Sequence, residues 1–313
     1  MLMKKILGLL VFSIAITACN DGDLVFDNFN FDEKDIQKCE DNELYFKINN
    51  NQLLLVDFSF GNNLSVLDSL APLNEMQKIP TSDRTKIYYR TYDAAVSKNV
   101  ICALLAPANP KVTSEYISIP GGTINYTRTM RPIVTETAVN VSYVYTINFE
   151  NITLTNGTSD IRYAVLPYGS YQYDNSRMSF NFTTNFTNCD NVLIGYTATE
   201  VVQLTLPENF VFPTANQTQN IPLNNTTDIQ YFVFKNSFSI DEDAPCEFPT
   251  ETIKEQWQST SGNVQIESSA ITNASGNVTG YRHQLKLQQT QFNNDLASFV
   301  ITERILGTYN TQI

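Results

Sequence analysis

The chain contains the same pattern twice, and this duplication constrains its fold more than any other feature. Residues 78–92 align without a gap with residues 220–234. The cysteines repeat as well, at offsets of 150 and 144 residues. Drifting offsets are expected of two copies of one fold whose loops have changed in length while their strands have not. The identical or corresponding positions are Ile79/Ile221, Pro80/Pro222, Thr85/Thr227, Ile87/Ile229, Tyr89/Tyr231, Cys39/Cys189 and Cys102/Cys246.

Alternation of apolar and polar residues is the dominant period in both copies, and it predicts half-buried strands. One strand is expected at residues 141–149, and its counterpart at residues 279–287 lies at an offset of 138. The apolar phase changes after Phe149, which predicts a turn or bulge at Glu150-Asn151. The apolar-face positions are Val141, Tyr143, Tyr145, Ile147 and Phe149 in the first copy and Thr279, Tyr281, His283, Leu285 and Leu287 in the second.

The composition also favours strands, because charged residues are sparse at 17% while Asn, Thr, Tyr and Phe are abundant. Pro120-Gly121-Gly122 is a turn that Ser261-Gly262-Asn263 repeats, and only residues 70–78 suggest a short helix. We therefore expect an all-β protein of two tandem homologous β-sandwich domains, at residues 28–172 and 178–313. An immunoglobulin-like topology is the first choice, although the cysteine spacing does not establish it.

The first residues describe an export signal. Lys4 and Lys5 precede an apolar run, residues 6–16, which is too short to span a membrane, and residues 1–18 form the expected signal peptide. Ile16-Thr17-Ala18-Cys19 resembles a bacterial lipobox, in which the cysteine is acylated and becomes the first residue of the mature chain. We expect lipidation at Cys19 and a polar tether over residues 19–27; an ordinary signal with an incidental cysteine is the alternative.

Four cysteines remain once Cys19 is assigned to lipid, two in each copy. An exported compartment favours oxidation, and four cysteines allow three pairings. The repeat selects the pairing within each copy, Cys39 with Cys102 and Cys189 with Cys246. Each bond closes a loop of about 60 residues, which stabilises the fold by about 4 kcal/mol in the chain-entropy model. Four reduced, buried thiols are the alternative.

The charge excludes one class of partner. Residues 1–18 hold two of the 20 Lys and Arg and none of the 32 Asp and Glu, so the formal charge changes from −12 to −14 without them. Such a chain is repelled by phosphate backbones, and nucleic-acid binding is not expected. The densest acidic run, Asp241-Glu242-Asp243, lacks the spacing of a calcium loop, and we expect a solvated loop, no metal and no cofactor.

Catalysis is not expected. His283 is the only histidine, so a Ser-His-Asp or multi-histidine zinc site cannot form within one chain. It occupies the position of Tyr145 on an apolar strand face, which favours a packing role. Trp257 aligns with Tyr116 and is expected to pack as well. A hydrolase with paired carboxylates stays open, but no acidic pair is selected by its spacing.

The lipobox, the acids Asp21 and Asp23 after Cys19, and the repeats rich in Asn, Thr and Tyr together resemble cell-envelope lipoproteins of Flavobacteria-type Bacteroidota. The resemblance implies a disulfide-stapled pair of β domains that is anchored and displayed on the outer membrane. It implies no particular activity, and we expect a non-enzymatic lipoprotein with a structural or interaction role at the cell surface. The periplasmic face remains the alternative location. An envelope protein or a glycan is the expected partner, and a glycan-binding accessory lipoprotein of an uptake system is the alternative function. Asp68-Ser69-Leu70 resembles the O-glycosylation motif of such proteins and makes Ser69 a candidate.

Overall fold

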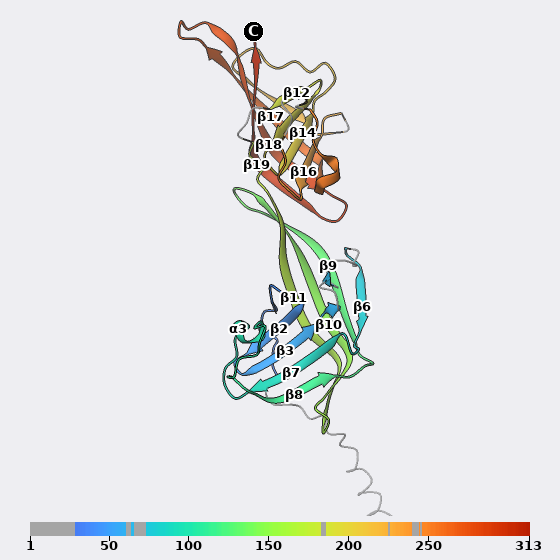
Figure 1. The fold of residues 1–313 in the computed structure, drawn as a ribbon. Coiled ribbons are helices and arrows are strands. Elements are labelled where there is room, and N and C mark those ends of the chain that lie inside the picture. The colour runs from blue at the N-terminus through green and yellow to red at the C-terminus, as the bar shows by residue number, and fades with distance from the viewer. Residues whose placement is uncertain are drawn as a thin grey trace, which may run out of the picture. The chain divides into compact units, whose positions relative to one another are not determined.

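The computed structural model describes residues 29–60, 64–65, 73–182, 186–224, 226–239, 244 and 246–313 (Figure 1). The expected all-β class is confirmed, and each half of the chain contains an antiparallel sheet and one disulfide. Among the described residues, no helix is both long and apolar enough to cross a membrane.

The first repeat forms a nine-stranded sheet in the order β1-β2-β3-β7-β8-β10-β9-β6, with β11 paired to β10. A two-stranded sheet, β4 (Ser59–Phe60) with β5 (Leu64–Ser65), and a short helix, α3 (Lys98–Ile101), accompany it. Residues 76–78, part of the expected helix, lie in strand β6 instead, because β6 pairs along its length with β9. The bounds are β1 (Gln37–Lys38), β2 (Leu44–Asn49), β3 (Gln52–Asp57), β6 (Met76–Pro80), β7 (Lys86–Tyr92), β8 (Val112–Ser118), β9 (Thr123–Val134), β10 (Val139–Thr155) and β11 (Asp160–Met178).

The second repeat forms an eight-stranded sheet in the order β12-β13-β14-β16-β17-β18-β19, with β15 paired to β17. Its order matches that of the first repeat, except that the single long strand β17 takes the places of both β8 and β9. Figure 1 shows β17, β18 and β19 running side by side. The bounds are β12 (Thr187–Cys189), β13 (Val192–Tyr196), β14 (Glu200–Thr205), β15 (Gln217–Pro222), β16 (Ile229–Phe234), β17 (Ile253–Thr272), β18 (Val278–Asn293) and β19 (Ser298–Gln312), with a 3₁₀ turn η1 (Thr250–Thr252) before β17.

Each sheet changes its outer pairing at a glycine. Gly121 and Gly262, at equivalent positions, both have φ of +117°, which L side chains rarely adopt. Before Gly121, β8 pairs with β7, and after it β9 pairs with β6. In the second repeat, β17 pairs with β16 before Gly262 and with β15 after it. The strand across the sheet bends at the same level, with φ of +51° at Asn151 and +46° at Gln289. The positive φ at Asn151 confirms the irregularity predicted at residues 150–151.

Two compact units divide the described chain. Unit 1 contains the described parts of Met1–Ala71, together with Glu75–Thr127 and Thr146–Tyr171; unit 2 contains the described parts of Pro72–Asn74, with Arg128–Tyr145 and Gln172–Ile313. The sheet of unit 2 curls until the segment before β12 bonds to β19, through Phe182 N–H to the Leu306 carbonyl at 2.7 Å. Its core is lined by alternate residues of β14, β16, β17, β18 and β19, including Trp257, which is buried as expected.

The disulfides are confirmed as Cys39–Cys102 and Cys189–Cys246, with sequence separations of 63 and 57 residues. Each disulfide packs on one face of its sheet, and the main core packs on the opposite face. Cys39 lies with Phe46, Leu53 and Leu55, and Cys189 lies against Phe232 and its neighbours. The β strands beneath each disulfide are therefore covered on both faces, which explains their nearly continuous apolar sequences.

The two glycines provide a matched test of the bend. An alanine at position 121 would meet no atom within 4 Å, whereas at position 262 its Cβ would lie 2.6 Å from the Gln289 carbonyl oxygen. We expect Gly121→Ala to cost about 1–3 kcal/mol through backbone strain alone. We expect Gly262→Ala to cost about 1–3 kcal/mol more through the close contact. Hydrogen exchange of the β8 and β17 amides measures both, and equal losses would contradict this account.

Candidate functional site: a polar platform in the second repeat

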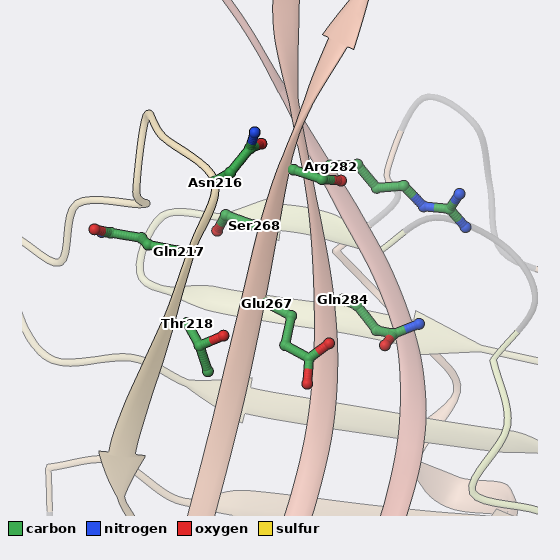
Figure 2. Close-up of a pocket in the computed structure, with 8 residues that line it drawn as sticks. Asn216, Gln217, Thr218, Glu267, Ser268, Arg282 and Gln284 are labelled. Atoms are coloured by element: carbon green, nitrogen blue, oxygen red, sulfur yellow. The ribbon is translucent and has the colours of Figure 1, made fainter.

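Polar side chains gather on the outer face of unit 2 where β15, β17 and β18 lie side by side. They line an open depression of about 440 Å³. Figure 2 shows its residues on the three strands. We call this surface the platform; it is lined by Asn216, Gln217, Thr218, Glu267, Ser269, Arg282 and Gln284, with the buried Ser268 at its floor.

Strand register places the platform in rows. Thr218 pairs with Glu267, and Glu267 pairs with Gln284, so these three form one row across three strands. Ser269 pairs with Arg282 in the next row. The Asn216 side chain accepts the Ala270 backbone N–H at 2.9 Å and fixes the end of β15 against β17. Except for Asn216, which lies just before β15, the platform side chains therefore come from paired strands.

The central side chains of the platform do not form hydrogen bonds or ion pairs with one another. Among the described residues, Glu267, Arg282 and Gln284 form no side-chain hydrogen bond and no ion pair with another residue. Glu267 has a coulombic interaction with Lys286, whose own ion pair is with Glu303 at 2.9 Å. Arg282 is exposed, and in Figure 2 its guanidinium extends away from the row. One carboxylate, one guanidinium and several amides are thus available to a ligand.

The fold itself does not require the platform. The first repeat has the same strands, and its equivalent positions are Met76, Thr127, Val144 and Thr146 in place of Thr218, Glu267, Arg282 and Gln284. No charged residue occurs among these four. The remaining platform positions are polar in both repeats, because Asn74, Glu75 and Arg128 correspond to Asn216, Gln217 and Ser268. The charges of Glu267 and Arg282 therefore distinguish the second repeat, whereas the polar character of this edge does not.

His283 lies directly beneath the platform and is fully buried, as expected from its place on the inner face. Its Nδ1 is 2.8 Å from Ser268 Oγ and its Nε2 is 2.9 Å from Thr311 Oγ1. Its ring centroid is 4.7 Å from that of Phe212. The imidazole is thus both packed and hydrogen-bonded at each nitrogen. The sequence analysis predicted the packing but missed both hydrogen-bond partners.

Burial lowers the pKa of His283, because a charged imidazole is poorly solvated in this setting. Ser268 is buried too, with 6% of its surface exposed. A serine beside a histidine resembles part of a nucleophilic site. Here, however, both groups are enclosed and both imidazole nitrogens are occupied, so the pair stabilises the pairing of β17 with β18.

Two buried carboxylates also serve the fold. Glu200 accepts the backbone N–H of Ser179 at 2.8 Å. Glu255 accepts the Ser176 hydroxyl at 2.6 Å and the Trp257 indole N–H at 3.1 Å. Together they hold the chain that enters the second repeat against β14 and β17. Sequence reasoning did not single out either acid, since neither lies in a motif.

Several sequence predictions fall outside the described residues: the lipid site Cys19, the candidate Ser69 and the acidic run at residues 241–243. Within the part of the chain that is described, no group of three or more His, Cys, Asp or Glu side chains could hold a metal ion. The four disulfide cysteines, in contrast, are placed as predicted.

Comparison with known proteins identifies no family: no family model, no curated protein and no solved structure matches this chain.

Titration of the single histidine, His283, tests directly whether the interior beneath the platform is closed to solvent. Because burial lowers its pKa, the folded protein binds fewer protons than the unfolded chain once pH falls below about 6.5. The stability that the neutral imidazole contributes is therefore complete above that pH and is lost as pH falls towards the folded-state pKa. We expect the one imidazole Hε1 resonance to titrate with a midpoint below 6.5.

His283→Gln removes the titration while keeping a polar side chain, and it is the matched control. The wild type should lose more unfolding free energy than this variant between pH 7.5 and pH 5.5, as measured by urea titration. His283→Ala should destabilise at neutral pH by about 2–4 kcal/mol, since it removes a buried ring and leaves Ser268 and Thr311 without their partner. A midpoint at or above 6.5 would show that the imidazole is not enclosed.

Proposed function

We propose that the protein is a non-enzymatic envelope lipoprotein, anchored in the outer membrane through Cys19 and exposed at the cell surface. Its role is to bind an envelope partner. The lipobox at residues 16–19 supports the anchor, and the platform of the second repeat supports the interaction. The platform is the observation that carries the proposal, because the side chains of Glu267, Arg282 and Gln284 form no hydrogen bond with another described residue. The equivalent positions of the first repeat hold Thr127, Val144 and Thr146.

Binding fits the arrangement better than catalysis does. The groups with the chemistry of a base or nucleophile, His283 and Ser268, bond each other below the surface. The buried acids Glu200 and Glu255 already accept hydrogen bonds from the chain around them. The exposed platform side chains, such as Thr218, Ser269 and Arg282, in contrast, face solvent on strands that a covered sheet holds in place. A rigid polar surface can orient a ligand without reacting with it.

A glycan is the second candidate partner, and the donor and acceptor set of the platform favours it specifically. Sugar hydroxyls both donate and accept hydrogen bonds. Glu267 can accept them, Arg282 can donate to them, and the amides of Asn216, Gln217 and Gln284 can do both. A row of such groups along three strands suits an extended chain of sugars. In this case the protein would be an accessory lipoprotein of an outer-membrane uptake system.

The anchor is tested by Cys19→Ser. We expect the variant to lose metabolic fatty-acid labelling and to leave the membrane fraction, since acyl chains supply the stable membrane attachment. Ser69→Ala provides the matched control and should leave both labelling and fractionation unchanged. Continued membrane association of unlabelled Cys19→Ser protein would place the anchor elsewhere.

The platform is tested on a glycan array and by calorimetry with the glycans that bind. We expect Glu267→Ala and Arg282→Ala each to weaken binding by about 10- to 100-fold, the usual effect of losing a hydrogen bond to a charged group. Thr127→Ala and Thr146→Ala, at corresponding positions of the first repeat, should have no effect. If those variants weaken binding as much as Glu267→Ala does, the ligand does not use the platform.

A further inference from the structure

A second unusual surface lies in unit 1, in the loop between α3 and β8. Residues 103–109 are all exposed, and the side chains of Leu104 and Leu105 expose 97% and 87% of their surface. The sequence there is Ala-Leu-Leu-Ala-Pro-Ala-Asn, and no charged residue occurs between Lys98 and Lys111. Adjacent leucines that face water with no charge nearby mark a contact surface. We call residues 103–109 the leucine loop.

The leucine loop stands on a fixed base. Cys102 is bonded to Cys39, and its backbone N–H donates to the Lys98 carbonyl at 2.9 Å. At the other end, the Lys111 N–H donates to the Asp93 carboxylate at 2.8 Å. Val100 and Ile101, just before the loop, pack against the core beside Cys39. The base is therefore folded, while the two leucines pack against nothing described.

The second repeat lacks this feature, although it has the equivalent disulfide. Six residues lie between Cys246 and the start of β17, against nine between Cys102 and the start of β8. The apolar residue in the shorter connection, Phe248, turns inward and lies 5.2 Å from the ring of Phe232. The fold thus accommodates this connection without exposed leucines, and the longer apolar version occurs only in the repeat next to the lipid site.

The covalent structure limits how far the leucine loop can lie from the membrane. Twenty residues separate Cys19 from Cys39, and a fully extended chain of that length spans at most about 70 Å. Cys39 is joined to Cys102, one residue before the loop. If Cys19 is acylated, the tether therefore keeps the loop at high local concentration near the bilayer. Under these conditions even a weak apolar contact becomes occupied.

We infer that the leucine loop inserts Leu104 and Leu105 into the surface of the lipid bilayer that holds the anchor. The inference rests on the proposed lipid anchor and adds a second, non-covalent contact to it. Each lysine at the base has an acid near it, since Lys98 pairs with Glu40 at 3.7 Å and the Asp93 carboxylate accepts the backbone N–H of Lys111. The loop therefore brings no excess positive charge, and the contact fits zwitterionic lipid. Apolar side chains at such an interface bind in proportion to the area they bury.

The test attaches the protein chemically, so that it does not depend on cellular lipidation. The chain from residue 19 is oxidised, which leaves Cys19 as its only thiol, and is coupled to maleimide-phosphatidylethanolamine in phosphatidylcholine vesicles with brominated acyl chains. Leu104→Trp reports insertion, because bromine quenches an indole that enters the acyl region. Trp257 is fully buried, and the protein without added tryptophan gives its background.

We expect the indole of Leu104→Trp to be quenched and blue-shifted. Val165→Trp is the matched control: Val165 lies in unit 1 and exposes 61% of its surface, yet it lies on strand β11 and should show no quenching. Adding Leu105→Ser to Leu104→Trp should lower the ratio of inserted to free loop by about tenfold.

Quenching of Leu104→Trp no greater than that of Val165→Trp would overturn the inference and would leave a protein partner as the occupant of the loop. Failure of fatty-acid labelling at Cys19 in cells would overturn the anchor instead. The two results are independent, because the coupled protein reaches the vesicle in either case.

Discussion

The glycine break in each sheet is the constraint on which the rest of the structure depends. Gly121 and Gly262 share the same φ of +117°, and each lies level with a residue of positive φ on the neighbouring strand. At this level the sheet exchanges one outer neighbour for another. In the second repeat the strands before the break lie beneath the disulfide, whereas those after it include β15 and form the platform. A side chain at Gly262 would meet backbone atoms across the sheet.

Comparing the two repeats distinguishes the features that the fold requires from the surfaces that occur in one repeat only. Both repeats have the same strand order, the same glycine break and one disulfide on the same face. The surfaces differ. The charges of Glu267 and Arg282 belong to the second repeat, and the leucine loop belongs to the first. Comparison of the two repeats therefore shows that the scaffold requires neither the leucine loop nor the charges of Glu267 and Arg282.

The sequence predicted the features that follow from the internal repeat and from the alternation of apolar and polar residues. It identified both disulfides, the equivalence of residues 141–149 and 279–287, and the burial of His283. The bonds of His283 to Ser268 and Thr311 could not be predicted, because the register of β17 and β19 decides them. The platform consists of ordinary polar residues on solvent-facing positions, which no periodicity distinguishes. The sequence analysis did not single out Leu104 and Leu105, and only their exposure in the folded chain distinguishes them.

The central claim is that a shared scaffold presents a membrane contact from one repeat and a ligand surface from the other. Hydrogen exchange of the protein, compared in solution and attached through Cys19 to vesicles, tests it most directly. Attachment should slow exchange in residues 103–109 while leaving their counterparts, residues 247–252, and the platform strands unchanged. Slower exchange in β15 and β17, or none in residues 103–109, would contradict this division of roles.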